Sequence, residues 1–413
     1  MSFTAVNEAD GMPGKMKIFW LNLGFLDRDM DLSERMQILQ ALAEQEVEVR
    51  TNFNYIKTPI KTPLPIDGLD KVWILSRRAK GVLGTIFLFA EQQLTLIKNF
   101  CVDVIVVSPF NLHQAVPLWL LCRKILRRQR PKFVMDVRTL PVDLPDNWRG
   151  RLRQKRFNAG VYLAFQYFDG LTMITEKMKT DLQKETNNFE KEICVWSSGV
   201  DPKLFDPDNV DDFTEKLGFQ DRFVIMYHGF LSPNRGLQQA IEAIAMVRKK
   251  YPEIMLLLLG KGPAQTELEE HIRNLRLENH VLIHPPVPFE EVPGYIKSAQ
   301  VGILPFPDLH WWNTSSPIKL NEYMAMKKPV IVTDIVAHRV VLGKQKCGFY
   351  VPDNKPASLA RSIKTVLERK SELSALGEIA RKKAIEHFTW EKQARKIKAY
   401  FQALFRDGSV SLS

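Results

Sequence analysis

Lys319 and Glu322 stand one helical turn apart in the stretch from Thr314 to Asp334, a spacing that places both side chains on one helix face. Ser315, Ser316 and Pro317 precede them and predict a helix that begins in a polar loop. A helix start offers unbonded N–H groups and a positive dipole end, which suit a phosphate or a sugar hydroxyl. Glu322 could then accept hydrogen bonds from both hydroxyls of a ribose. The same spacing also fits an ordinary ion pair on a helix surface.

A loop after the predicted strand Phe223–Tyr227 offers a second arrangement that suits phosphate. Gly236 lets the backbone turn closely into the next helix, and Arg235 stands beside the positive end of that helix. An arginine in this position can hold two phosphate oxygens at once. His228 and Gly229 lie at the strand end and could face a ligand. A histidine there also fits a core position, and Arg235 also fits an ordinary surface cation.

Other side chains that could contact a ligand follow further predicted strands. Gly262 lies in a Gly-Lys-Gly-Pro turn after the predicted strand 254–259, which could lie near a ligand or be an ordinary turn between a strand and a helix. Asp136 lies near the end of the predicted strand Phe133–Val137, and Arg138 directly follows this strand. The two side chains could either face a ligand or pair with one another. Two adjacent tryptophans, Trp311–Trp312, precede the central stretch and favour a sugar or lipid contact over a core position.

The acidic run Asp27–Asp31 matches an Asp-x-Asp metal motif twice. It lies directly before a predicted helix opened by Ser33, so carboxylates that stabilise a helix start explain it better, and we expect no metal. The four cysteines include no Cys-x-x-Cys pair, which argues against a zinc site and for buried thiols in a reducing compartment.

The chain alternates short β-rich runs with helical stretches along most of its length, a pattern that predicts α/β architecture with parallel sheets covered on both faces. The predicted strands are 18–23, 47–53, 72–75, 104–107, 133–137, 171–174, 194–196, 223–227, 254–259, 281–284, 301–304, 330–333 and 349–351. Helical periodicity is clearest in 32–45, 83–99, 114–128, 152–168 and 390–405, with Thr389 as the expected N-cap of the last helix.

The pattern breaks at Gly199–Asn209, which contains two prolines and predicts a linker between two doubly wound, Rossmann-like domains. We expect a loose tail over 1–15, a first domain over 16–200, a second over 201–386 and a final segment over 387–413. Such an arrangement predicts a ligand cleft between the carboxyl edges of the two sheets.

Positive charge is concentrated in the first half of the chain. The formal net charge is +11, and the segment from Arg123 to Arg156 alone holds 12 Lys or Arg and three Asp or Glu. This block could face anionic lipid, an acidic acceptor or nucleic acid, or serve only for solubility. Trp148 and the aromatic run 161–168 favour contact with a membrane surface, and no nucleic-acid module is recognisable. The apolar runs are too short to span a bilayer.

The stretch Pro317–Ala325, followed by Lys328-Pro-Val-Ile, resembles the donor-site segment of glycosyltransferase family 4, retaining enzymes of the GT-B fold. The resemblance extends to the Gly-Val-Asp linker at Gly199 and to Phe388-Thr-Trp-Glu, which is similar to the family's final helix that crosses back to the first domain. The resemblance covers nearly the whole chain, but it is loose before about Ile193.

This resemblance implies a role for each matching residue. Glu322 would contact the ribose, Arg235 and Lys319 would hold the diphosphate, and Arg138 would face the acceptor or the transferred sugar. Gly24 falls where the family has a glycine-rich loop under the sugar. Three positions depart from the family pattern: Phe230 replaces an arginine, Thr139 the second residue of an Arg-Asp pair, and Thr314 an acidic residue whose sugar contact would pass to Ser315 and Ser316.

The resemblance implies a retaining, metal-independent glycosyltransferase with no cofactor, which takes a UDP- or GDP-type nucleotide-diphosphate sugar. The acceptor would be a glycan or a lipid-linked glycan in the cytoplasm, with peripheral contact to anionic membrane and no nucleic acid. A GT-B scaffold that binds glycan or a partner enzyme without turnover is the alternative, because each departure removes an expected charged group. We expect Glu322→Ala to weaken donor binding with little loss of stability.

Overall fold

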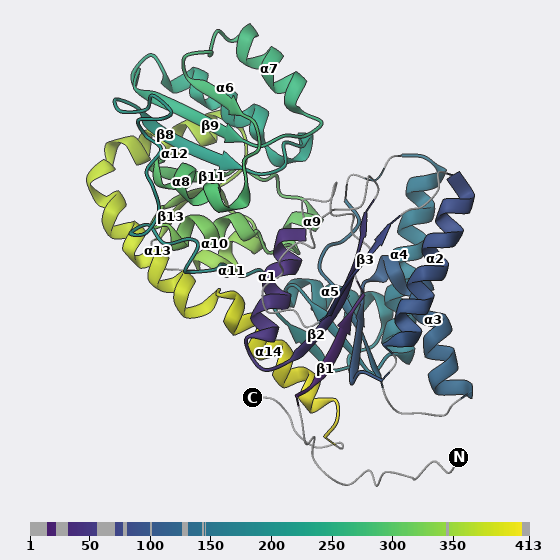
Figure 1. Cartoon of the computed structure of the whole chain (residues 1–413). Coiled ribbons are helices and arrows are strands. Elements are labelled where there is room, and N and C mark those ends of the chain that lie inside the picture. The colour runs from purple at the N-terminus through teal and green to yellow at the C-terminus, as the bar shows by residue number, and fades with distance from the viewer. Residues whose placement is uncertain are drawn as a thin grey trace. The chain divides into compact units, whose positions relative to one another are not determined.

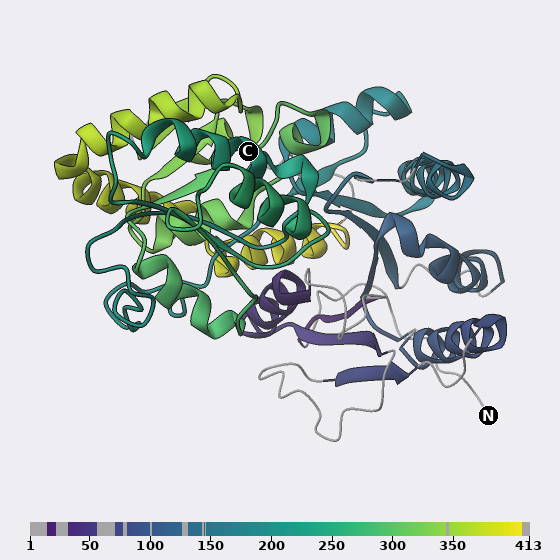
Figure 2. The ribbon, with the colours of Figure 1, turned by 90° about the horizontal axis from the view of Figure 1, so that it is seen from above.

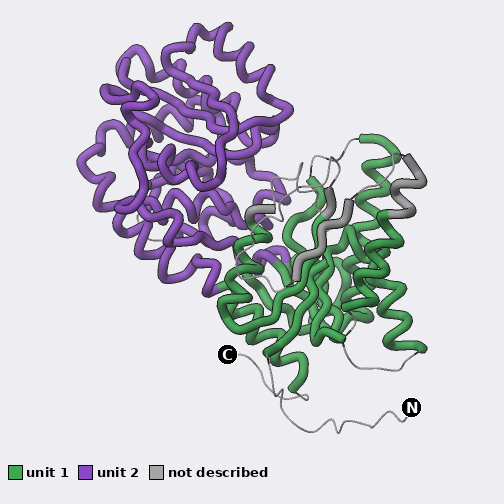
Figure 3. The backbone as a smooth tube through the Cα atoms, in the orientation of Figure 1, with its two compact units in different colours: residues 1–173, 179–196, 393–413 green, residues 174–178, 197–392 purple. Residues whose placement is uncertain are grey.

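The computed structural model describes residues 15–21, 32–55, 71–76, 81–99, 101–125, 131–142, 144, 146–343 and 347–406. The chain forms two compact units (Figure 3). Unit 1 contains residues 1–173, 179–196 and 393–413, and unit 2 contains residues 174–178 and 197–392. Each unit is built on its own parallel sheet.

The described part of unit 1 forms a seven-stranded sheet in the order β3-β2-β1-β4-β5-β6-β7. Its register aligns Ile18 with Val49 on one side and with Val104 on the other. The elements are β1 Lys17–Trp20, α1 Leu32–Ala43, β2 Glu48–Tyr55, β3 Lys71–Ser76, α2 Gly81–Lys98, β4 Val104–Val107, α3 Leu112–Leu120, β5 Lys132–Val137, α4 Trp148–Tyr167, β6 Gly170–Met173, α5 Glu176–Thr186 and β7 Ile193–Val195.

Helices cover both faces of this sheet, which is why its central strands are buried along most of their length. All four residues of β4 are buried, as are the last five of β5. Helices α2, α3 and α4 lie on one face, and α1 lies on the other (Figures 1 and 2). This division follows from right-handed crossovers, because the chain moves one way from β1 to β3 and the other way from β4 to β7.

The described part of unit 2 forms a six-stranded sheet in the order β10-β9-β8-β11-β12-β13. Its elements are β8 Phe223–His228, α6 Leu237–Val247, β9 Ile254–Leu259, α7 Gln265–Asn274, β10 Val281–His284, α8 Val292–Lys297, β11 Val301–Leu304, α9 His310–Asn313, α10 Ile318–Ala325, β12 Val330–Thr333, α11 Val336–Leu342, β13 Gly348–Val351, α12 Pro356–Glu368, α13 Leu373–His387 and α14 Trp390–Ala403.

The core of unit 2 is continuous, and its central strands β8 and β9 are buried at every position. Helix α6 packs beside α12, and α10 packs beside α13. Gly302 on β11 allows the ring of Tyr323 on α10 to lie against the sheet, because a Cβ at this glycine would come within 2.6 Å of that ring. The sheet therefore holds α10 close to the strand ends.

The boundary between the units differs from the expected one. The chain passes from unit 1 to unit 2 between Trp196 and Ser197, before the predicted boundary at residue 200, because Ser198 and Val200 are hydrogen-bonded within unit 2. Helix α14 begins in unit 2, where Thr389 caps its first turn by accepting from the Lys392 N–H. Residues from 393 onward group with unit 1.

Most predicted elements are present within one or two residues, but the helix predicted over 114–128 is not regular. Helix α3 contains Pro117, and it gives way to a wider π-helical turn over Leu121–Ile125. No helix in the part of the chain that the structure describes is both long enough and apolar enough to cross a membrane.

Candidate functional site

Three glycines shape the carboxyl ends of β8 and β9 in unit 2. Gly229 has a φ of 113° and donates its N–H to the Leu259 carbonyl, at 2.8 Å. Gly260 has a φ of 146°, and a Cβ there would lie 2.0 Å from the Gly229 carbonyl oxygen. At Gly262 a Cβ would lie 2.2 Å from the Leu231 carbonyl oxygen. Because only glycine fits these positions, the two strand ends form a tightly packed backbone turn.

Lys319, in the first turn of α10, lies across Gly229. A Cβ on this glycine would come within 2.4 Å of the Lys319 Cε and 2.9 Å of its Nζ. The structure thus brings together two residues that the sequence places 90 positions apart and predicts for one site. The lysine ammonium lies near the start of a helix and beside a side-chain-free stretch of backbone, which is a favourable place for an anion.

Glu322 is one turn further along α10 and contacts His228 at the end of β8. Glu322 Oε2 lies 3.3 Å from His228 Nε2, although the geometry of this contact is not that of a hydrogen bond. Burial, together with the charge of Lys319, holds the pKa of His228 well below its ordinary value of 6.5, so the imidazole is neutral at pH 7. His228 therefore occupies a buried position beside the predicted site.

The burial of Glu322 corrects one expectation. Only 2% of this residue is exposed, so truncation to alanine would leave a cavity and reduce stability, whereas we expected little loss. A glutamine, which has the same shape, is the better probe of the carboxylate. The neighbouring residue on α10, Asn321, is also buried and donates from its side chain to the Ser198 carbonyl at 2.9 Å.

Arg235 lies at the end of a short 3₁₀ turn, Pro233–Arg235, directly before α6. Its guanidinium carbon is 5.0 Å from the ring centroid of Trp312 and 5.6 Å from that of Phe306. These two rings are themselves stacked at 4.4 Å. The cation is thus held against an aromatic pair, a contact that orients the planar guanidinium and stabilises its charge.

Trp312 has a structural role that the sequence did not reveal. Its indole N–H donates to the Asn234 carbonyl at 2.9 Å, and the ring packs against the core of unit 2. Trp312 is only partly buried, so the prediction that Trp311–Trp312 lines a sugar or lipid site stays a prediction. This ring fixes the loop that carries Arg235.

His338 supports the aromatic pair from the side of the core. The residue is fully buried, and its ring centroid lies 5.6 Å from that of Phe306. Its Nδ1–H donates to the Thr333 carbonyl at 2.7 Å, and the Thr333 hydroxyl donates to the Phe306 carbonyl at 2.6 Å. Burial lowers the pKa of His338 to about 4, so this support is uncharged at neutral pH.

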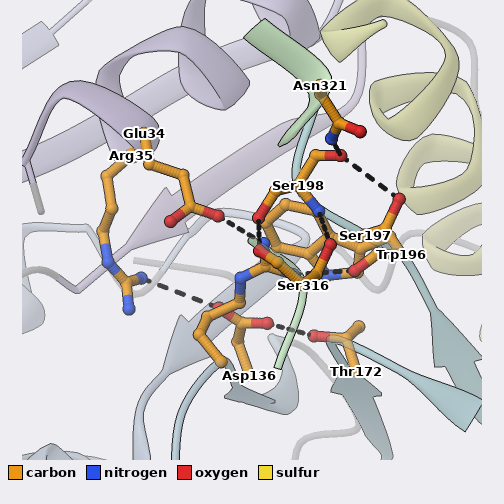
Figure 4. A network of polar contacts seen from close by, with 10 residues as sticks. Glu34, Arg35, Asp136, Thr172, Trp196, Ser197, Ser198, Ser316 and Asn321 are labelled. Atoms are coloured by element: carbon orange, nitrogen blue, oxygen red, sulfur yellow. Dashed lines mark hydrogen bonds and ion pairs between the residues drawn. The ribbon is translucent and has the colours of Figure 1, made fainter. Parts of the chain in front are cut away.

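The hydroxyls before α10 serve the local structure. Thr314 is buried and its hydroxyl bonds to carbonyls of α9, while the Ser315 hydroxyl donates to the Trp312 carbonyl at 2.8 Å. The Ser316 hydroxyl accepts from the Ser198 N–H at 3.1 Å (Figure 4). Pro317 is the N-cap residue of α10 and provides no side-chain cap. The sugar contact expected of Ser315 and Ser316 stays a prediction.

Asp136 and Arg138 belong to unit 1. They do not form an ion pair with each other, which was the alternative to a ligand contact. The Thr172 hydroxyl donates to Asp136 at 2.7 Å, and Arg35 lies 3.7 Å from its other carboxylate oxygen (Figure 4). Complete burial raises the pKa of Asp136 against the influence of the nearby arginines Arg138 and Arg35. A buried carboxyl of this kind can be functional or structural.

Arg138 binds the last residue of unit 1 before the linker. It donates to the Trp196 carbonyl at 2.7 Å and to the Glu34 carboxylate at 2.5 Å, and its guanidinium lies 3.5 Å from the Trp196 ring centroid. This arrangement, with one planar face stacked and both ends bonded, fixes Trp196 firmly. The sequence indicated Asp136 and Arg138 but none of their partners, because Glu34, Arg35 and Trp196 lie far away along the chain.

Gly24 and the acidic run Asp27–Asp31 lie outside the described residues, as does the expected tail over 1–15 except for its last residue. Within the described part, no group of three or more His, Cys, Asp or Glu side chains could hold a metal ion. Cavities of about 400 Å³ beside β13 and α12, and about 770 Å³ beside β7 and α14, are lined by none of the predicted site residues.

Comparison with known proteins finds a family match in unit 2. Residues 209–383 match the family model of glycosyl transferases group 1. This segment, which we name the group 1 domain, is similar to that family and makes up less than half of the chain. The group 1 domain contains Arg235, Lys319 and Glu322, whereas Asp136 and Arg138 lie outside the matched residues.

Individual relatives agree with this assignment. A putative glycosyltransferase of Bacillus subtilis, YtcC, is 23% identical over 248 residues, which cover 57% of this chain and 60% of that protein. A GDP-mannose-dependent mannosyltransferase of Mycolicibacterium smegmatis is 31% identical over 109 residues, 26% of this chain and 28% of that protein. The chain therefore spans less than two thirds of the length of these curated relatives.

The crystal structure of HepE from Anabaena in complex with UDP-glucose is similar to the whole molecule. It aligns with a TM-score of 0.72 at 19% identity and covers 94% of this chain and 100% of that one. The group 1 domain is thus part of a two-domain α/β fold of the GT-B type, as the sequence predicted.

Proposed function

We propose that this protein is a glycosyltransferase that moves a sugar from a nucleotide-diphosphate sugar to a glycan or a lipid-linked acceptor. The observation that carries the proposal is the position of Lys319 across Gly229, at the start of α10, inside the group 1 domain. This arrangement suits an anion at the strand ends. Arg235, held on its aromatic pair, supplies the second cation of the same domain.

The chemistry would depend on charge that develops during bond breaking. When the bond between the sugar and the diphosphate breaks, negative charge grows on the leaving phosphate, and the cations of Lys319 and Arg235 would stabilise it together with the N–H groups at the start of α10. Positive charge would grow on the sugar ring. The leaving phosphate itself could take the proton of the acceptor, with retention of configuration and without a metal.

The donor is proposed to be of the UDP or GDP type. The similar structure of HepE contains UDP-glucose, and the M. smegmatis relative is named for its dependence on GDP-mannose. Glu322 would reach the ribose hydroxyls after its carboxylate turns away from His228. An acceptor that is linked to lipid would bring the enzyme to the cytoplasmic face of a membrane.

A transfer assay tests this proposal. The purified full chain is incubated with UDP- and GDP-sugars and a mixture of lipid-linked acceptors, and nucleoside diphosphate release is measured with and without EDTA. We expect release from one donor class, unaffected by EDTA and lowered about 100-fold by Lys319→Met or Arg235→Met. The control Lys249→Met removes an exposed lysine of the same unit and should retain activity. Equal activity in all three variants would contradict the proposed site.

A scaffold that binds without turnover is a second candidate, and two observations favour it. Glu322 is buried, and Phe230, which stands where the family has an arginine, is 41% exposed and leaves the site with one cation fewer. Under this reading the protein would bind a glycan or a partner enzyme, and any nucleotide-diphosphate sugar supplied to it would be recovered intact. The same assay, followed by mass spectrometry of the donor, distinguishes the two candidates.

A further inference from the structure

The outer face of α4 in unit 1 carries both cations and apolar side chains. Its buried side consists of Gly150, Phe157, Gly160, Val161, Ala164 and Phe165, which pack toward the sheet. On the opposite side, Trp148 is 63% exposed, Leu152 50% and Leu163 37%. Leu152 lies about one helical turn after Trp148 and Leu163 about three turns after Leu152, so the three side chains share the solvent side of the helix.

Basic residues surround this apolar stripe. Arg149, Arg151, Arg153, Lys155 and Arg156 are all exposed, and the 20 residues of α4 include no Asp or Glu. Asp146, before the helix, lies 3.5 Å from Arg151, and both side chains are largely exposed, so this contact removes little of the charge. An exposed helix that combines five cations with large apolar residues is unusual for a surface that meets only water.

The neighbouring helices extend the same surface. The rings of Tyr167 on α4 and Trp119 on α3 are 5.8 Å apart, and those of His113 on α3 and Phe89 on α2 are stacked at 6.3 Å. Helices α2, α3 and α4 therefore form one layer on a face of the unit 1 sheet (Figures 1 and 2). Ten of the 18 large hydrophobic residues that are exposed in the described part lie on this layer and the π-helical turn after α3.

We propose that this layer, which we name the α4 surface, docks onto an anionic lipid bilayer. Cations attract anionic headgroups from a distance, and tryptophan, tyrosine and leucine side chains enter the interface between headgroups and acyl chains. A second copy of the chain fits this surface poorly, because the five cations of α4 would face five identical ones. Nucleic acid would leave the apolar stripe without a partner.

This proposal rests on the proposed function only in that a lipid-linked acceptor would explain why an enzyme should dock there. Docking can be measured without donor or acceptor. Failure of vesicle binding would leave the donor site untouched, and failure of donor binding would leave the α4 surface untouched.

Co-sedimentation of the full chain with vesicles tests the proposal. We expect binding to vesicles of phosphatidylcholine with phosphatidylglycerol, little binding to phosphatidylcholine alone, and a decrease with added salt. The pair Arg151→Glu and Lys155→Glu should lower the partition coefficient at least about tenfold. The pair Lys203→Glu and Lys249→Glu makes the same change in net charge on exposed residues of unit 2 and should retain binding.

Apolar variants test the other half of the surface. Trp148→Ser with Leu163→Ser should weaken binding to anionic vesicles severalfold, whereas Met246→Ser with Val340→Ser, at exposed positions of unit 2, should not. Equal losses in the surface and control pairs would overturn the proposal, as would equal binding to both vesicle types. Stronger binding to duplex DNA, or a dimer in solution that the apolar pair dissociates, would assign the surface to nucleic acid or to a second copy instead.

Discussion

The two cations of the proposed donor site are held by different means. Lys319 is a flexible point charge that lies over a glycine, whereas Arg235 is a planar group fixed on the rings of Phe306 and Trp312. In the proposed reaction Lys319 could move to follow a phosphate as it leaves, while the position of Arg235 would be set before the ligand arrives. This difference predicts that the aromatic pair contributes to function without contacting the substrate.

The buried His338 behind Phe306 should make stability depend on pH. Folding lowers the pKa of His338 from 6.5 to about 4, so the unfolded chain takes up a proton first as the pH falls. Above pH 6.5 this histidine therefore leaves the free energy of unfolding almost unchanged. At pH 5 it lowers the free energy of unfolding by about 2 kcal/mol. Urea unfolding at pH 7 and pH 5 should show a smaller difference for His338→Gln than for the wild type.

The matched control for this measurement is His387→Gln, which removes an exposed histidine of the same unit. It should keep the pH dependence of the wild type. His228 is also buried with a lowered pKa, and it lowers stability at acidic pH in the wild type and in both variants. His338→Gln should therefore reduce the pH dependence of the unfolding free energy without abolishing it. If His338→Gln showed the same pH dependence of unfolding free energy as the wild type, His338 would not be buried in its neutral form.

At the scale of elements, the site depends on how closely α10 approaches the ends of β8 and β9. This approach is possible because Gly302 admits the ring of Tyr323, whose hydroxyl donates to the Met226 carbonyl at 2.8 Å. The helix is thus fixed to β8 at one point and brings Lys319 over Gly229 at another. A site of this kind is set by backbone packing more than by side-chain contacts.

Substitution of Gly229 tests that packing. Gly229→Ala would place a methyl group against Lys319 and strain a backbone with a φ of 113°. We expect a loss of about 1–3 kcal/mol in unfolding free energy and weaker binding of nucleoside diphosphate. Gly218→Ala, at a φ of 68° with no heavy atom within 4 Å of the new Cβ, should cost about 1 kcal/mol and leave nucleotide affinity unchanged. Unaltered affinity in Gly229→Ala would contradict the position of Lys319.

The sequence predicted the elements of this site well and their packing poorly. Apolar strands and the Ser-Ser-Pro helix start indicated β8, β12 and α10, because these signals are local. The burial of Glu322 beside His228 could not be predicted, since it depends on the distance between a helix and a strand that are far apart in the chain. The same reason explains why Trp312 was assigned to a ligand and not to the support of Arg235.

At the scale of the whole molecule, the alternation of strands and helices was sufficient to predict two parallel α/β units, whereas the GT-B fold was implied by the resemblance to glycosyltransferase family 4. The change of unit lies a few residues before the expected boundary at residue 200, because Ser198, which we assigned to the first domain, is hydrogen-bonded to Ser316 within unit 2. The strand order of each sheet was not predicted, as it follows from crossovers that single elements do not encode.

Equilibrium binding of nucleotides tests the central claim most directly. Titration calorimetry of the full chain with UDP and with GDP should show binding of one of them, weakened at least about tenfold by Lys319→Met, since the variant loses a charged hydrogen bond. Lys249→Met should bind as the wild type does. If a folded wild-type protein bound neither nucleotide, or if Lys319→Met bound with unchanged affinity, the strand ends of β8 and β9 would not be the donor site.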